Sequence, residues 1–464
     1  GALLFTGFNP LLAVEETMNI MQNKMSDNIG ILLFLAFLGI LVTLITKSGA
    51  SKAYGDWAAK KIKSERGALL ATSFLGMLIF VDDYFNCLTV GTVMKPVTDK
   101  YKISRAKLAY VIDSTAAPVC IIAPISSWAA AVGSSLPENS GIDGFSLFIR
   151  TIPFNLYALL ALAFMLYIIY KGIDFGTMKK HIQAVERGEI EEISQDAEIE
   201  ITGKGKVMDL ILPIVILIVL CISAMLYTGG ILEGETIQSA FANCDSTTSL
   251  VLGSFFTLIF TFILYISRKV INFQEFCDSF TQGVKSMVPA IMILSLAWTL
   301  SGICSAEYLN IGGYVGGLVG GSALIGALLP FLFFIIATGL AFSTGTSWGT
   351  FGILIPIAIA ILGTGDINLV SINVAAILAG AVCGDHISPI SDTTILASAG
   401  AQCNHIVHVS TQIPYALVVA GCSAVGFLAS GITQNGWIGL GVGSIAMVIA
   451  LWVITKREEK LKNA

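Results

Sequence analysis

The sequence predicts an all-α polytopic membrane protein. Of its 464 residues, 55% are apolar and only 12% are charged, and the mean hydropathy is +0.82. Soluble domains carry roughly 25% charged residues. Apolar stretches long enough to cross a bilayer recur along the chain, and two of them contain prolines inside polar sequence. The chain is therefore expected to work within a lipid bilayer and not on nucleic acid.

The chain start and the cysteines exclude two other classes of protein. The first residues, GALLFTGF, have no initiator Met and no basic region, so they do not resemble a signal peptide and look like the end of an earlier span. The nine cysteines stand singly without a CxxC pair, so neither a disulfide framework nor a zinc knuckle is indicated. No cofactor is expected.

The first half is expected to fold around a hairpin that enters the membrane without crossing it. An amphipathic helix at 9–27 and a span at 28–46 precede it. The apolar stretch 67–96 is divided by VDDYFN and has basic segments on both sides, so both its ends should lie on one face. Each arm of about 14 residues reaches ~20 Å as a helix, part of a ~30 Å core. We expect a re-entrant hairpin, then a broken span at 108–134 and an intact span at 151–170.

The second half repeats this order. An amphipathic helix and a span, at 272–286 and 287–303, precede a hairpin at 324–362 with the tip FSTGTSWGT and a broken span at 371–399. A span at 412–430 follows. The predicted organisation is a first repeat, a solvated cytoplasmic linker, two connecting spans, a second repeat, and a last span with a basic tail, at residues 9–170, 171–206, 207–267, 268–430 and 431–464.

Two features predict that the repeats are inverted. Pro124-Ile-Ser-Ser aligns with Pro389-Ile-Ser-Asp. When every Lys and Arg except Lys24 and Arg150 is placed on one face, the two hairpins open to opposite sides. The positive-inside rule makes that face, with the C-terminal tail, cytoplasmic. Inverted repeats are the usual construction of secondary transporters with a site near the bilayer centre.

The candidate site consists of polar segments inside apolar sequence. In GDHISPISDTT, Pro389 should break the helix and free backbone carbonyls. Carboxylates at membrane depth are costly, usually functional, and need a cation or protons to balance them. Carboxylates, hydroxyls and freed carbonyls suit Na⁺, so Asp385 and Asp392 are the predicted Na⁺ ligands. The predicted ion- or substrate-binding residues of both tips and both breaks are Asp82, Asp83, Asn86, Asp113, Ser126, Ser343, Thr344, Thr346, Ser347, Asp385, His386, Ser388, Ser391, Asp392 and Thr393.

Structural roles stay open for several of these residues. Asp82 either caps the hairpin helix or binds the cation, and Asp113 either lies on the pathway or pairs with a cytoplasmic Lys or Arg. His386 is either a proton site or a hydrogen-bonded structural residue. The Cys and two His at 403–408 do not have the spacing of a zinc site.

The segments FVDDYFNCLTVGTVMKPVTDKYKISRAKLAYVIDSTAAPVCIIAPISSW and GDHISPISDTTILAS resemble the NhaC-type Na⁺/H⁺ antiporter family of the ion transporter superfamily. The resemblance covers residues 10–430 and implies an inverted-repeat fold with two re-entrant hairpins and two broken helices. It also implies exchange of Na⁺ for H⁺ in a bacterial inner membrane, and a homodimer.

Two other functions were weighed. Relatives also move organic acids or amino acids, so Na⁺- or H⁺-coupled transport of an amino acid, organic cation or carboxylate stays an alternative. An intramembrane hydrolase is disfavoured because Asp385 and His386 are adjacent and would point roughly 100° apart on a helix. No GxSxG motif occurs, so the sequence predicts a transporter and not an enzyme.

Overall fold

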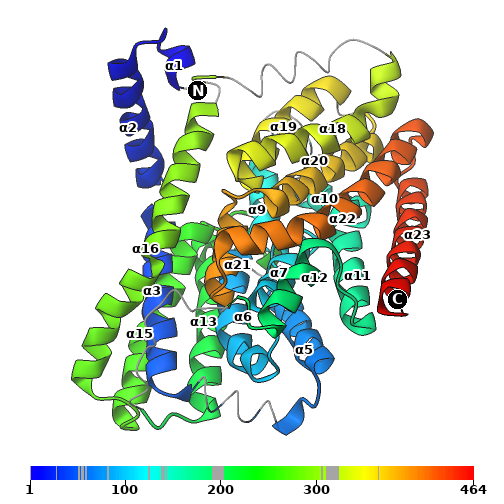
Figure 1. Cartoon of the computed structure of the whole chain (residues 1–464). Coiled ribbons are helices and arrows are strands. Elements are labelled where there is room, and N and C mark those ends of the chain that lie inside the picture. Colours follow the sequence, from blue (N-terminus) through cyan, green and yellow to red (C-terminus); the bar gives the residue numbers. More distant parts are fainter. Residues whose placement is uncertain are drawn as a thin grey trace.

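The computed structural model describes residues 2–27, 29–50, 53, 57, 60–80, 83–123, 126–136, 142, 144–190, 203–304, 307–309, 323–363 and 365–463. Within these ranges the chain is helical and contains no β-strand (Figure 1). Seven of the described helices are long and apolar enough to cross a membrane, or eight when one bent pair is counted as a single span. The predicted class, an all-α polytopic membrane protein, is confirmed.

One side of the molecule is built from helices of the chain start and the middle of the chain. α3 (Ile29–Lys47) packs against α15 (Ser246–Ser267) and α16 (Phe273–Cys304), and α13 (Val207–Thr228) packs against α15 (Figure 1). α2 (Pro10–Asp27) lies along α16. α16 is one continuous helix of 32 residues, where the sequence suggested an amphipathic helix followed by a separate span. The helix continues through the boundary between the two segments, although Pro289 lies close to it.

Within the predicted first repeat, α2 and α3 are followed by the two helices of the first hairpin. Neither of these two is among the described helices that are long and apolar enough to cross a membrane, and their re-entrant placement stays a prediction. The following span is interrupted at Ala116 and again after Cys120, near Pro118, and Pro124 lies outside the described residues. The elements are α5 (Glu65–Leu78), α6 (Asp83–Lys100), α7 (Arg105–Thr115), α8 (Ala117–Cys120), α9 (Ser127–Ser134) and α11 (Leu156–Lys171).

The predicted second repeat, 268–430, begins with α16 on the first side of the molecule, and its later helices lie on the other side (Figure 1). Its first hairpin arm, α18, has 22 residues and is long enough to cross a membrane, whereas the second arm, α19, is a shorter apolar helix. The two arms therefore differ in length. A break at 388–391 divides the next span. The elements of this part are α18 (Ala323–Thr344), α19 (Ser347–Leu362), α20 (Ile367–Ile387), α21 (Asp392–Ala401) and α22 (His405–Thr433). α23 (Gly436–Asn463) follows the repeat and corresponds to the predicted last span and tail.

The described part of the predicted linker is not simply solvated. α12 (Gly176–Glu186) packs against α22, and the Thr177 hydroxyl donates to the Ser410 carbonyl at 2.6 Å. Before it, Asp174 accepts hydrogen bonds from Lys107 on α7 and from Tyr415 on α22. Residues 191–202 lie outside the described residues. The first half of the segment therefore ties the two predicted repeats together.

The remaining elements are short. They are α1 (Ala2–Phe5), α10 (Gly144–Thr151), η1 (Ile152–Phe154), η2 (Ile231–Glu233) and α14 (Ile237–Ala242). The order of hairpin, broken span and intact span occurs twice along the chain. The inverted orientation of the repeats in a membrane stays a prediction.

Candidate functional site

The break between α20 and α21 is built by local sequence. Pro389 has no backbone N–H and cannot continue the helix. The Ser388 hydroxyl donates to the Phe342 carbonyl at 2.8 Å, and the Ser391 hydroxyl accepts from the Thr394 N–H at 3.1 Å, which caps α21. Ser388 and Ser391 therefore stabilise the two broken ends.

Asp385 lies at this break and is fully buried. Its Oδ2 accepts a hydrogen bond from the Thr393 hydroxyl at 2.6 Å, and that hydroxyl lies 3.2 Å from Ser391 Oγ. Within the described ranges its Oδ1 has no hydrogen-bond partner. A buried carboxylate oxygen without a donor is unusual, because leaving such a group unpaired costs free energy.

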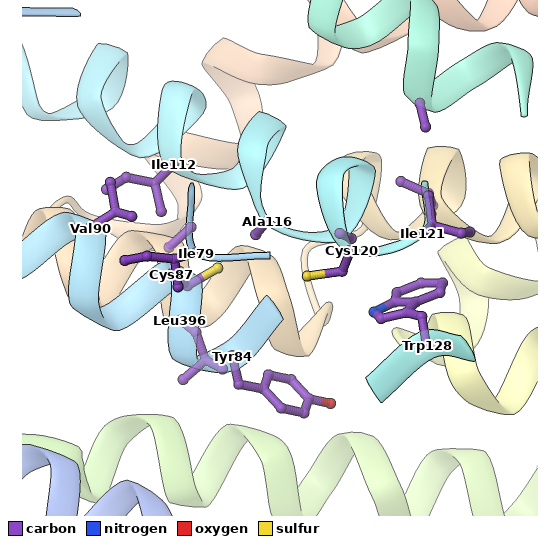
Figure 2. Close-up of a cluster of buried hydrophobic side chains, with 14 of the residues drawn as sticks. Ile79, Tyr84, Cys87, Val90, Ile112, Ala116, Cys120, Ile121, Trp128 and Leu396 are labelled. Atoms are coloured by element: carbon purple, nitrogen blue, oxygen red, sulfur yellow. The ribbon is translucent and has the colours of Figure 1, made fainter. Parts of the chain in front are cut away.

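Asp392, the first residue of α21, joins this break to the first hairpin. Its Oδ1 accepts from the Thr393 N–H at 2.8 Å, and its Oδ2 accepts from the Tyr84 hydroxyl on α6. Cys87, one turn further along α6, lies 3.6 Å from the Thr393 carbonyl. Figure 2 shows Tyr84 and Cys87 in one buried cluster with Trp128 of the first broken span. The first tip and both breaks therefore meet.

Asp113, which is also fully buried, comes from the first broken span. Its Oδ2 accepts from the Thr394 hydroxyl at 3.0 Å and from Gln412 Nε2 at 2.6 Å, and its Oδ1 has no partner among the described residues. The same Thr394 hydroxyl lies 3.3 Å from the Asp385 carbonyl. His408 Nε2 is 3.9 Å from Asp113 Oδ2. Asp113 therefore faces the second break and not a Lys or Arg.

His386 is buried beside these carboxylates. Its Nδ1 lies 3.1 Å from the Tyr157 hydroxyl of α11, its carbonyl accepts from Gln412 Nε2 at 2.9 Å, and its Nε2 has no partner in the described part of the chain. The predicted site residues did not include Tyr84, Tyr157, Thr394, His408 or Gln412. The available signal was the i, i+4 spacing of His408 and Gln412, which places both on one face of an apolar helix.

The described residues of the first tip differ in role. The Asn86 amide donates to the carbonyls of Gly76 and Ile79, each at 2.7 Å, and of Thr115 at 3.2 Å, so it holds α5, α6 and the first break together. Asp83 is buried in the first turn of α6, and its Oδ1 accepts from the Tyr84 N–H at 3.2 Å. Asp82 lies outside the described residues.

The second tip also contacts the break between α20 and α21. Gly345 has φ +69°, and a Cβ there would lie 2.3 Å from the Ile390 carbonyl oxygen. Its carbonyl is 3.4 Å from the Asp392 N–H, and the Ser347 hydroxyl donates to the Ala381 carbonyl at 3.2 Å. This tip therefore contributes backbone groups and Ser347.

Several predicted hydroxyl ligands are engaged with nearby backbone instead. Ser343 is exposed. Hydroxyls bonded to a preceding carbonyl of their own segment are a common local arrangement. The hydroxyls of Ser343 and Thr344 donate to the Leu340 carbonyl, Thr346 accepts from the Gly349 N–H, and Ser126 donates to the Cys120 carbonyl.

Three buried carboxylates thus surround one polar centre. None of Asp113, Asp385 and Asp392 forms an ion pair with a Lys or Arg within the described residues. No group of three or more His, Cys, Asp or Glu in those residues is arranged like a metal centre. Two unpartnered carboxylate oxygens and neighbouring hydroxyls are the oxygen ligands that a small hard cation takes.

Helices long and apolar enough to cross a membrane, one broken helix and buried carboxylates without a Lys or Arg partner among the described residues are typical of a membrane transport protein. A family model described as the Na⁺/H⁺ antiporter family matches residues 129–432. The chain belongs to the Na⁺/H⁺ antiporter family, as the sequence resemblance indicated. It is therefore a secondary transporter and not an enzyme.

Three relatives extend this comparison. An uncharacterized protein of Haemophilus influenzae is 38% identical over 463 residues, which are 97% of this chain and 88% of the relative. The malate-2H⁺/Na⁺-lactate antiporter of Bacillus subtilis is 26% identical over 208 residues, 40% of this chain and 43% of the relative. An uncharacterized Na⁺/H⁺ antiporter of Haemophilus influenzae is 28% identical over 153 residues, 29% of each chain.

Proposed function

We propose that this protein exchanges Na⁺ for H⁺ by alternating access. The observation that carries the proposal is the group of three buried carboxylates, Asp113, Asp385 and Asp392, without an ion-paired Lys or Arg among the described residues. Buried negative charge without a partner is costly. A bound Na⁺ or bound protons would each remove that cost, and binding one would release the other.

Asp385 is the residue best placed to hold the cation. Its free Oδ1 and its Thr393-bonded Oδ2 both lie at the end of α20, where the helix dipole favours positive charge. The Thr393 and Ser391 hydroxyls supply further oxygens. Asp392 lies at the N-terminus of α21 and is held by Tyr84, so it is the second proposed ligand.

The membrane placement belongs to the same proposal. The hairpins α5–α6 and α18–α19 enter from opposite faces, and the two repeats are related by inversion, so that opening either side exposes the same site. The charge distribution supports a cytoplasmic C-terminus in a bacterial inner membrane. A homodimer is proposed from the resemblance to the ion transporter superfamily.

A second candidate is coupled transport of a small organic solute. One observation favours it: a relative matching 40% of the chain is named a malate-2H⁺/Na⁺-lactate antiporter. The carboxylates of this site suit an ammonium group better than an organic anion, because none of them is ion-paired with Lys or Arg in the described residues. An amino acid or organic cation is therefore the preferred solute of this alternative.

Purified protein in liposomes tests the proposal. An inward Na⁺ gradient should drive protons outward, as reported by a pH-sensitive dye, and Asp385→Asn should abolish the signal. The exposed Glu459→Gln is a matched carboxylate control that should leave it unchanged. Proton movement that requires an added amino acid or organic acid would favour the alternative, and no proton movement in any condition would refute antiport.

A further inference from the structure

Two histidines and one serine form a hydrogen-bonded chain that begins at the half-buried His405 and ends beside Asp113. His405, at the start of α22, is half-buried, whereas His408 is fully buried. Ser398 Oγ lies between them, 3.1 Å from His405 Nδ1 and 2.8 Å from His408 Nδ1. The chain continues through His408 Nε2, which is 3.9 Å from Asp113 Oδ2.

The Nε2 atom of each ring, which points away from Ser398, must carry a hydrogen. His405 Nε2 is 2.7 Å from the Pro389 carbonyl oxygen, which only accepts. His408 Nε2 is 3.0 Å from Gln412 Oε1. While Asp113 is a carboxylate, the orientation of this amide is set, because its nitrogen donates to Asp113 Oδ2 and to the His386 carbonyl. Both Nε2 atoms are therefore donors.

The two Nδ1 atoms, which both face Ser398 Oγ, cannot both form hydrogen bonds if the two rings are neutral. A neutral ring with a hydrogen on Nε2 has a bare, accepting Nδ1. Ser398 has one hydroxyl hydrogen and three acceptors within reach, the Thr394 carbonyl at 2.7 Å and the two Nδ1 atoms, so it can donate to His405 or to His408 but not to both. One additional proton resolves the conflict: one ring becomes an imidazolium whose Nδ1–H donates to Ser398 Oγ, and Ser398 donates to the neutral ring.

We propose that His405, Ser398 and His408 form the relay that carries protons between the aqueous surface and Asp113. This inference rests on the proposed proton-coupled function. In the relay step the His405 Nδ1 proton moves to Ser398 Oγ while the Ser398 hydroxyl proton moves to His408 Nδ1. His405 becomes neutral, Ser398 keeps one hydrogen, and His408 becomes the imidazolium beside Asp113.

The remaining transfer spans 3.9 Å, longer than a hydrogen bond, so His408 and Asp113 must move closer for it. His408 then gives its Nε2 proton to Asp113, which becomes a neutral carboxylic acid while the ring becomes neutral with its hydrogen on Nδ1. The Gln412 amide turns in the same step, so that its nitrogen donates to the bare His408 Nε2 and its oxygen accepts from the Asp113 acid. The Asp113 carboxylate is the charged side chain within 4 Å of His408 Nε2, and its Oδ1 has no partner among the described residues. When both rings are charged, Ser398 can turn its hydrogen to the Thr394 carbonyl, which lies 2.7 Å away.

Ser398→Ala tests the relay without touching the proposed ion ligands. In proteoliposomes, Na⁺-driven proton movement should slow by roughly tenfold or more, since a positioned proton-transfer group contributes on the order of 10²-fold. Exchange of ²²Na⁺ for Na⁺ at equal pH needs no proton transfer and should be unchanged. His405→Gln, at a half-buried position, should likewise slow Na⁺-driven proton movement and leave ²²Na⁺ exchange unchanged.

Ser423→Ala is the matched control, because Ser423 is a buried serine of α22 whose hydroxyl donates to the Val419 carbonyl at 2.8 Å. It should leave both rates unchanged. Wild-type proton movement in Ser398→Ala and His405→Gln would overturn the relay while leaving antiport intact. Absence of Na⁺-driven proton movement in the wild type would refute the proposed function instead.

A second measurement tests the relay independently of transport. The ring ¹⁵N shifts of His405 and His408, measured by NMR in lipid nanodiscs, should show one imidazolium shared by the two rings. In Ser398→Ala the two rings should titrate separately. Two neutral rings in the wild type, at a pH where Asp113 receives protons, would overturn the relay.

Discussion

Replacing Gly91 by Ala should force the first hairpin away from the second broken helix. A Cβ at Gly91 of α6 would lie 2.4 Å from the Gly400 carbonyl carbon and 2.6 Å from its Cα on α21. Both contacts are with backbone, which cannot rotate aside. Normal contact between carbon atoms is at about 3.5–4.0 Å, so the two helices must separate by about 1 Å.

The energetic cost follows from overpacking. Inserting one methyl group into a closely packed interface destabilises by about 1–3 kcal/mol. The same displacement would lengthen the Tyr84–Asp392 hydrogen bond, which joins the same two helices. Gly91→Ala should therefore lower both the free energy of unfolding and the transport rate.

Steric trapping in lipid micelles measures that free energy directly. Gly421→Ala is the control, because a Cβ there meets no atom within 4 Å and Ala is favoured over Gly in a helix by roughly 0.5–1 kcal/mol. The free energy of unfolding of the Gly421→Ala control should be unchanged or higher than that of the wild type. If Gly91→Ala is as stable as the control and transports normally, the close approach of α6 and α21 does not exist in the protein.

Three further predictions use the same assays. Asn86→Ala removes two N–H donors that three buried carbonyls share and should lower the free energy of unfolding by about 2–4 kcal/mol; a loss near zero would contradict its role in joining the hairpin to the first break. Lys107→Met leaves Asp174 without its ion-pair partner and should lower the free energy of unfolding by about 2–4 kcal/mol. Adding Asp174→Asn to this variant should restore part of that loss, whereas additive losses in the double variant would refute the pairing. Thr393→Val keeps the side-chain shape but removes the hydroxyl bonded to Asp385, so half-saturation should need roughly fivefold to tenfold more Na⁺; an unchanged value would exclude this hydroxyl from the site.

The residue types that break helices made the second break predictable. Pro389 removes a donor, and the polar residues around it are out of place in an apolar span, so the interruption at 388–391 and the burial of Asp385 and Asp392 followed from local sequence. The two helices α5 and α6 match the predicted arms, whereas the re-entrant placement inferred from the flanking basic segments stays a prediction. The continuous helix α16 differs from the two separate elements that the change from amphipathic to apolar sequence suggested. Such a change does not by itself end a helix.

The partners of the carboxylates were not predictable, since they come from distant parts of the chain. Gln412 is 299 residues from Asp113, and Tyr84 is 308 residues from Asp392. Local sequence showed polar residues on α22 but not the helix they face. Ser343 and Thr344 were selected by residue type alone, yet their hydroxyls bond to the preceding turn of their own helix.

The most direct test of a shared site for Na⁺ and H⁺ is proton release on Na⁺ binding. Purified protein in weakly buffered detergent solution should acidify the solution when NaCl is added, and not when choline chloride is added. The release should disappear in Asp385→Asn, because the carboxylate that exchanges the proton is gone. Saturable ²²Na⁺ binding without proton release, or equal release in Asp385→Asn, would contradict exchange at this carboxylate.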